Sequence, residues 1–154
     1  HQVSEAEVES IRQEMEQKER KAMELANQTA DIIFPGEQQP ESDHGIRYEQ
    51  AETGTNKDRH FRRAKGWFGY TLKTSKEANR LMITTRKNDP MKVVILLNNE
   101  KLTAAPTISE TDQEGFVILC YPLPQKLGAG NYPIRFSPDG TEWTPAIYEI
   151  RLLE

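Results

Sequence analysis

The sequence predicts a mainly β domain, an antiparallel β-sandwich or jelly roll with an N-terminal α-helix. Short apolar runs recur through residues 66–154, and several of them alternate with polar residues. Turn signals such as Asn98-Asn99 and Pro138-Asp139-Gly140 separate these runs, and no helical periodicity lies between them. This pattern is typical of an antiparallel sandwich. The length of 154 residues fits one domain with a short appendage.

Residues 1–30 are expected to form the N-terminal helix. Ser4 and Glu7 have the spacing of a capping box. The apolar residues follow a spacing of three, four and seven and mark one narrow stripe: Val8, Ile11, Met15, Ala22 and Leu25. Such a stripe fits a connector helix that packs on its own domain, or a partner helix of a coiled coil. The connector is favoured, because one helix offers few heptads.

Residues 31–65 are expected to form a polar arm that packs on the sandwich, so that 31–154 make one globular domain. Acidic residues dominate its first part, and basic residues dominate from 57 to 65. Pro35-Gly36 and Pro40 interrupt any helix. Residues 32–34, Ile-Ile-Phe, indicate one short strand or an apolar plug.

The sandwich itself is expected over residues 66–154. The predicted strands are Trp67–Lys73, Arg80–Arg86, Lys92–Leu97, Gly115–Tyr121, Asn131–Phe136 and Ala146–Leu153. The predicted core consists of Phe68, Tyr70, Leu81, Ile83, Val93, Ile95, Leu97, Phe116, Ile118, Ile134, Phe136, Ile150 and Leu152.

Acidic residues, a histidine and arginines in the arm form a candidate structural network: Glu37, Gln39, Glu41, His44, Arg59 and Arg62. Carboxylates beside an imidazole could bind a cation or perform acid–base chemistry, but this spacing matches no metal motif. A hydrolase that uses Glu37 and Glu41 is the least favoured alternative. The arginines could bind phosphate, but their pairing with the preceding acidic run explains both charge runs without a ligand. We therefore expect an internal network or a domain contact.

Exposed aromatic rings are the candidate sugar contacts, because the C–H face of a sugar packs on a π surface. Trp143 lies in a turn-rich segment between Gly140 and Pro145, where exposure is plausible. Trp67 and Tyr121 are further candidates, although an aromatic residue on a sandwich strand is more often part of the core.

Several classes of function are not supported by the sequence. It contains no nucleophile motif, phosphate-binding glycine loop or zinc signature, so we expect no catalytic residues, no metal and no cofactor. Cys120, the single cysteine, rules out an internal disulfide. The net charge of −4 argues against a nucleic-acid partner, and no apolar run is long enough for membrane insertion.

Two strings carry a resemblance to a known family. PGEQQPESDH (residues 35–44) and GWFGY (residues 66–70), with Arg59-His-Phe-Arg62 between them, resemble the C-terminal module of glycoside hydrolase family 127, the bacterial β-L-arabinofuranosidases and their relatives. Gly69 stands where that family has Ser. The resemblance covers nearly the whole chain. The pattern from GWFGY through LMITTR to VVILLNNEKL is also similar to carbohydrate-binding modules of families 6 and 35.

The resemblance implies a non-catalytic accessory β-sandwich, because catalysis in family 127 resides in a separate helical barrel with a Cys-rich zinc site. The sequence would then be a fragment of a glycoside hydrolase, as its start at His1 also suggests. Its partner would be the catalytic domain of the same chain, in a periplasmic or secreted protein. The alternative is a carbohydrate-binding module that recognises plant polysaccharides containing arabinose.

Overall fold

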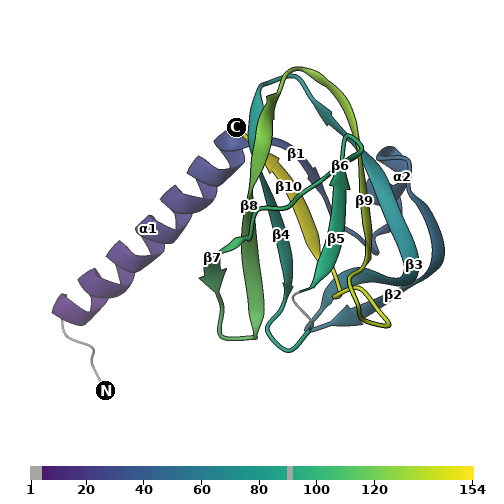
Figure 1. Cartoon of the computed structure of the whole chain (residues 1–154). Coiled ribbons are helices and arrows are strands. Elements are labelled where there is room, and N and C mark those ends of the chain that lie inside the picture. Colours follow the sequence, from purple (N-terminus) through teal and green to yellow (C-terminus); the bar gives the residue numbers. More distant parts are fainter. Residues whose placement is uncertain (1–4, 90–91) are drawn as a thin grey trace.

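The computed structural model describes residues 5–89 and 92–154. It shows two packed β-sheets and a long N-terminal helix, α1 (Glu5–Gln28), that leaves them at one corner (Figure 1). The prediction of a mainly β, antiparallel sandwich with an N-terminal helix is confirmed. Ser4 of the expected capping box lies outside the described residues.

Each sheet has five strands, and every described strand pair is antiparallel. The order in the first sheet is β1 (Thr29–Ile33), β10 (Glu149–Leu153), β4 (Ala78–Arg86), β8 (Phe116–Leu127) and β7 (Thr107–Thr111). The order in the second sheet is β2 (Arg47–Asn56), β3 (Arg59–Thr74), β9 (Gly130–Pro138), β5 (Val93–Leu97) and β6 (Glu100–Lys101). A short helix, α2 (Gln38–Asp43), connects β1 to β2.

The hydrophobic core fills the space between the inner faces of the two sheets. Phe68 on β3 is paired with Phe136 on β9, and their fully buried rings stack with centroids 5.1 Å apart. The predicted core residues that the structure buries are Phe68, Tyr70, Leu81, Ile83, Ile95, Leu97, Phe116, Ile134, Phe136, Ile150 and Leu152. Most of the core is therefore the one that strand alternation predicts.

Two predicted core residues, Val93 and Ile118, are only half-buried. Val117 and Leu119 belong to the main core, so the inward face of β8 is the one opposite to Ile118. Phe116 is buried in a small separate cluster with Ala146 and Tyr148 instead. The prediction for β8 had the wrong phase, because adjacent apolar residues from 116 to 119 hide the alternation.

The segment 31–65, expected as a polar arm on the sandwich, contributes strands to both sheets. It supplies most of β1, all of α2 and β2, and the first part of β3. Strand β2 lies at an edge of the second sheet and has no fully buried residue. An edge strand with polar side chains on both faces lacks the alternation that identifies strands in a sequence.

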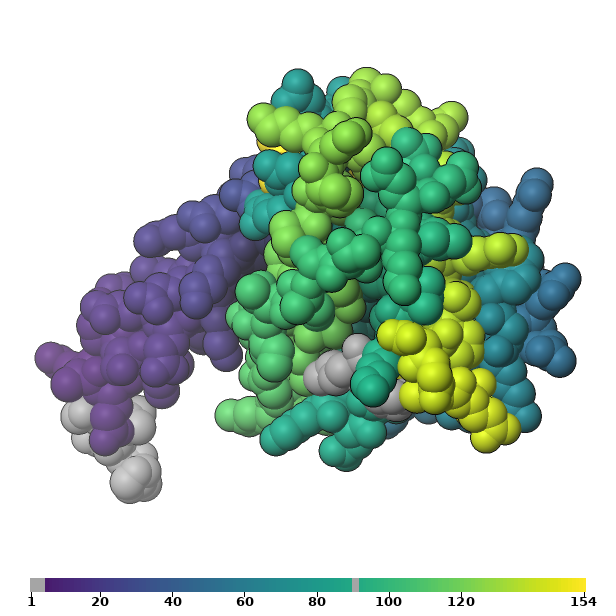
Figure 2. Space-filling view, in the orientation of Figure 1, coloured from purple at the N-terminus to yellow at the C-terminus, as the bar shows by residue number. Residues whose placement is uncertain are grey.

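Helix α1 does not pack on its own domain, contrary to the favoured interpretation. None of its residues is buried, and the helix stands clear of the sheets along most of its length (Figures 1 and 2). Val8, Ile11 and Met15 of the apolar stripe are 51%, 55% and 57% exposed. An apolar stripe of this width predicts that one face of the helix packs against another surface. It does not predict whether that surface belongs to the same domain or to a partner.

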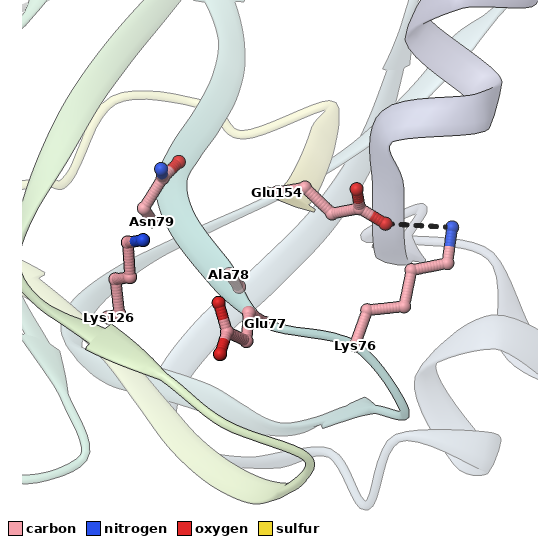
Figure 3. Close-up of a pocket in the computed structure, with 6 residues that line it drawn as sticks. All are labelled: Lys76, Glu77, Ala78, Asn79, Lys126 and Glu154. Atoms are coloured by element: carbon pink, nitrogen blue, oxygen red, sulfur yellow. Dashed lines mark ion pairs between the residues drawn. The ribbon is translucent and has the colours of Figure 1, made fainter.

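Among the contacts of residues 5–89 and 92–154, those that tie α1 to the sandwich all lie at its last turn. The Lys76 ammonium donates to the carbonyl oxygen of Asn27 and pairs with Glu154 at 3.1 Å (Figure 3), and the Glu154 amide donates to the Gln28 carbonyl. A cation beside the last carbonyls is favourable because these groups have no partner within the helix. The hollow of about 340 Å³ beside this junction also contains Glu77 and Lys126, so its charges balance.

Candidate functional site

An open groove of about 530 Å³ lies on the outer face of the second sheet. Its centre is a row of residues that pair across three strands, with Arg47 on β2 opposite Gly69 on β3, and Gly69 opposite Arg135 on β9. Gly69 has no side chain, so the floor stays low between two arginines. The groove is lined by Gly45, Arg47, Trp67, Gly69, Tyr70, Thr71, Leu96, Asn99, Pro133, Ile134 and Arg135.

Trp67 forms an aromatic wall of this groove. Its half-buried ring lies against Arg135, whose guanidinium carbon is 3.6 Å from the ring centre. A stacked guanidinium keeps its in-plane N–H donors free. Neither Arg47 nor Arg135 forms an ion pair with a described acidic residue, and no carboxylate lines the groove. Glu49 pairs with Trp67 in the strand register but lies outside the lining.

The other two candidate sugar contacts lie away from the groove. Trp143 is half-buried, with the Arg63 guanidinium carbon 4.3 Å and the Lys65 ammonium 5.1 Å from its ring centre. Tyr121 is only 6% exposed and belongs to the main core, so its candidacy as a sugar contact is wrong. Burial also raises the pKa of its phenol. A sequence cannot separate a ring on the inner face of a strand from one on the outer face when its neighbours are also apolar.

Two of the expected network residues form a buried ion pair beneath α2. Arg62 donates from Nε and Nη2 to the two Glu41 carboxylate oxygens, at 2.6 and 2.9 Å. The Tyr70 hydroxyl donates to the same carboxylate at 2.6 Å, and the Arg62 guanidinium carbon lies 4.5 Å from the centre of the Tyr48 ring. Burial alone would raise the pKa of Glu41, but the hydrogen bonds from Arg62 and Tyr70 hold it below its usual range.

His44 belongs to a second contact, with a residue that the expected network omitted. Its Nε2 lies 3.0 Å from Oδ1 of Asp31, and its Nδ1 lies 2.7 Å from the carbonyl oxygen of Pro40. The amide of Lys73 also donates to Asp31, at 2.7 Å. The hydrogen bond with Asp31 raises the pKa of His44. This pair ties α2 to β1 and β3 and leaves no ring nitrogen free for a ligand.

The remaining network residues lie apart. Gln39 donates to Asp43 within α2 at 2.8 Å, and the Glu37 side chain is exposed. Arg59 lies at the far end of β3, with its guanidinium carbon 4.5 Å from the centre of the Phe116 ring. Glu37 and Glu41 therefore do not face one cleft, because the Glu41 carboxylate is occupied by Arg62 and Tyr70.

A second hollow, of about 430 Å³, lies at the end of the sandwich near the β2–β3 turn. Tyr148, Phe61 and Arg86 are among its lining residues. One atom of Arg86, Nη1, and one of Asp89, Oδ2, are buried without a hydrogen-bond partner among the described residues. Burial raises the pKa of Asp89. This hollow is lined by two arginines and one carboxylate, and its Arg63 also pairs with Glu52, whereas the two arginines of the groove have no such acidic partner in the described part of the chain.

Within residues 5–89 and 92–154, no group of three or more His, Cys, Asp or Glu side chains could hold a metal ion. In the same residues, neither helix combines the length and the hydropathy that a membrane span requires.

Comparison with known proteins gives a family and a fold. Residues 24–153 match the model of DUF6805, a family of unknown function, and the chain belongs to this family. None of the curated proteins compared with the chain matches its sequence.

Solved structures similar to this one include carbohydrate-binding modules. A family 35 module from Clostridium thermocellum superposes with a TM-score of 0.55 at 12% identity, over 80% of this chain and 98% of the module. Xyl-CBM35 in complex with a disaccharide containing glucuronic acid superposes with a TM-score of 0.56 at 12% identity, over 81% of this chain and 94% of that one. The catalytic unit of a GH87 α-1,3-glucanase from Streptomyces thermodiastaticus gives 0.51 at 12% identity, over 82% of this chain and 26% of that one. At these identities the likeness concerns the fold, and the expected similarity to family 35 modules is confirmed at that level.

Proposed function

We propose that this member of the DUF6805 family is a carbohydrate-binding module, and that the groove on the outer face of the second sheet holds the sugar. The proposed role is binding and not catalysis. The observation that carries it is the row Arg47–Gly69–Arg135 beside Trp67, which combines a low floor, an aromatic wall and free hydrogen-bond donors. The similarity of the fold to that of carbohydrate-binding modules supports the proposal.

The chemistry of the groove favours a sugar that bears a carboxylate. An indole packs against the C–H face of a pyranose or furanose ring, and a guanidinium donates two parallel hydrogen bonds to a carboxylate. Two unpaired arginines with no acidic residue in the lining give the groove a positive charge. We therefore propose acidic residues of plant glycans, with arabinose-containing polysaccharides as the expected source. Neutral arabinan fragments would bind more weakly.

Calorimetric titration tests this proposal. The ligands are a disaccharide containing glucuronic acid and neutral arabinan oligosaccharides. We expect saturable binding of the acidic disaccharide, weakened at least about tenfold by Trp67→Ala and by Arg135→Gln, which corresponds to about 1.4 kcal/mol.

Trp143→Ala is the matched control, because Trp143 is also a half-buried indole beside cationic side chains and lies outside the groove. Its affinity is expected to equal that of the unaltered protein. Binding that survives Trp67→Ala and disappears in Trp143→Ala would place the site elsewhere, and no binding of either ligand would refute the proposal.

The accessory role in a family-127-like glycoside hydrolase remains a second proposal, and it rests on the sequence strings that resemble that family. A similar sandwich within the catalytic unit of an α-1,3-glucanase supports such an arrangement. We then expect a catalytic domain in the same chain and a periplasmic or secreted location. Deleting this domain from the parent enzyme should lower activity on polymeric substrate more than activity on a soluble fragment. Equal activities with and without the domain would contradict the proposed role.

A further inference from the structure

Helix α1 carries a continuous seam that is exposed from Val8 to Ala22, and Leu25 at its end is half-buried. The seam positions are spaced by three and four residues in strict alternation: Val8, Ile11, Met15, Lys18, Ala22 and Leu25. This is the a/d spacing of a coiled coil, with one lysine among apolar residues. The described contacts anchor the helix to the sandwich only by its last turn, and the rest of the helix runs away from the sheets (Figure 1), so its exposed length is open to a partner.

We propose that α1 pairs in an antiparallel manner with α1 of a second copy of this chain. Such a dimer has twofold symmetry, so each contact occurs twice. In this arrangement Ile11 faces Ala22 of the partner subunit, and Val8 faces Leu25 of the partner subunit. Near the twofold axis, Met15 faces Lys18 of the partner subunit, and the lysine stem covers apolar surface while its ammonium reaches solvent.

The charges beside the seam favour this partner. Residues that flank an antiparallel seam face the equivalent flank of the partner helix. On one flank, Glu14 faces Lys21 of the partner subunit. On the other flank, Arg12 faces Glu19 of the partner subunit. Both contacts are attractive, and symmetry doubles each of them.

The parallel arrangement of the same helices is disfavoured. It would place Lys18 against Lys18 of the partner subunit within the seam, and Glu14 beside Glu19 of the partner subunit. Like charges at such positions act against pairing, so the sequence of α1 selects the antiparallel orientation.

The pairing is compatible with the rest of the molecule. A helix of 24 residues is about 36 Å long, so an antiparallel pair keeps the two sandwiches at opposite ends. In the single chain Arg12 pairs with Glu9 at 2.7 Å, but both side chains are largely exposed. An exposed pair of this kind contributes little and can be exchanged for Glu19 of the partner subunit.

Sedimentation velocity of the full chain tests the pairing. We expect a reversible dimer, of twice the 17.7 kDa chain mass, to form before the chain reaches millimolar concentration. Lys21→Glu creates two repulsive contacts with Glu14 and should weaken the dimer about tenfold. The double variant Glu14→Lys/Lys21→Glu restores opposite charges and should restore the dimer. Arg20→Glu is the matched control, because Arg20 lies on the side of α1 away from the seam and the charge change is the same.

Disulfide trapping tests the orientation. In a Cys120→Ser background, an equal mixture of Ile11→Cys and Ala22→Cys chains should form the mixed disulfide on mild oxidation. Ile11→Cys alone should remain unlinked. A chain that stays monomeric at millimolar concentration, a dimer insensitive to Lys21→Glu, or self-linked Ile11→Cys would each overturn the proposal. If the chain is monomeric, the partner of the seam is a different segment or a different protein.

Discussion

The guanidinium carbon of Arg135 lies 3.6 Å from the centre of the Trp67 ring. This stacking covers part of one face of the indole and holds the arginine at the side of the groove. Arg135→Ala is therefore expected to expose the indole and to increase its quenching by acrylamide. The measurement is fluorescence in a Trp143→Phe background, so that Trp67 is the only emitter. Arg63→Ala in the same background is the control, because Arg63 lies beside position 143 and outside the groove, and it should leave Trp67 quenching unchanged. Equal quenching with and without Arg135 would contradict the stacking.

The pair Glu41–Arg62 is expected to dominate the polar contribution to stability. Glu41→Gln leaves the Arg62 guanidinium buried without a countercharge, which should lower the free energy of unfolding by about 3 kcal/mol. Tyr70→Phe, which removes one hydrogen bond to the same carboxylate, should cost about 1–2 kcal/mol. Urea unfolding measures both. Glu37→Gln is the control, because its side chain is exposed, and should change stability by less than about 0.5 kcal/mol. A Glu41→Gln loss no larger than this would contradict the account.

The pair His44–Asp31 gives stability a defined pH dependence. The hydrogen bond with Asp31 raises the pKa of His44 in the folded state. The stability that protonated His44 contributes is therefore complete below its unfolded pKa of about 6.5. It disappears as the pH rises through the higher pKa of the folded state. Burial alone would raise the pKa of Asp31, but the hydrogen bond with His44 and that from the Lys73 amide lower it overall. The stabilisation that the Asp31 carboxylate contributes is therefore present above its unfolded pKa of about 3.9. It disappears as the pH falls through the lower pKa that Asp31 has in the folded state.

The difference in stability between the unaltered protein and His44→Gln should thus be largest between about pH 4 and 6.5, near 1 kcal/mol, and should shrink at alkaline pH. Thermal unfolding across this pH range measures it. His60→Gln, a change at an exposed histidine, should show no such trend. A difference for His44→Gln that is constant with pH would mean that the pair does not titrate as described.

Gly69 keeps the floor of the groove open, and its strand lies close to β9. A Cβ atom at this position would lie 2.5 Å from the carbonyl oxygen of Ile134, so the two strands would have to separate. Gly69→Ala should cost about 1–3 kcal/mol and weaken sugar binding. Gly128→Ala is the control, because a Cβ atom there meets nothing within 4 Å. Unfolding and calorimetric titration of both variants check the prediction, and a stable Gly69→Ala protein that binds sugar normally would contradict it.

Much of the fold could be predicted because the central strands alternate clearly. Leu81 and Ile83 on β4, and Ile150 and Leu152 on β10, have the period of two that a buried face imposes. Strand β2 could not be recognised, because an edge strand without a buried residue has no such period. Whether the α1 stripe docks on its own domain depends on how the last turn is anchored, which the sequence does not show.

The groove could be predicted only in part. Trp67 was a candidate, but Arg47 and Arg135 were not, since residues 88 positions apart in the chain meet only through the registers of two strand pairs. Asp31 lies in the acidic first part of the segment 31–65, but its contact with His44 depends on where β1 passes α2. Register is set by side-chain packing across the whole sheet, so no local pattern reports it.

A nuclear magnetic resonance titration of the ¹⁵N-labelled chain with the glucuronic-acid disaccharide tests the central claim most directly, because it locates the ligand. The account predicts saturable shifts of the Trp67 indole N–H and of the amides of Gly45 and Gly69, with the Trp143 indole unchanged. Shifts confined to Trp143, or to Tyr148 and Arg86 at the end of the sandwich, would contradict the claim that the groove is the sugar site.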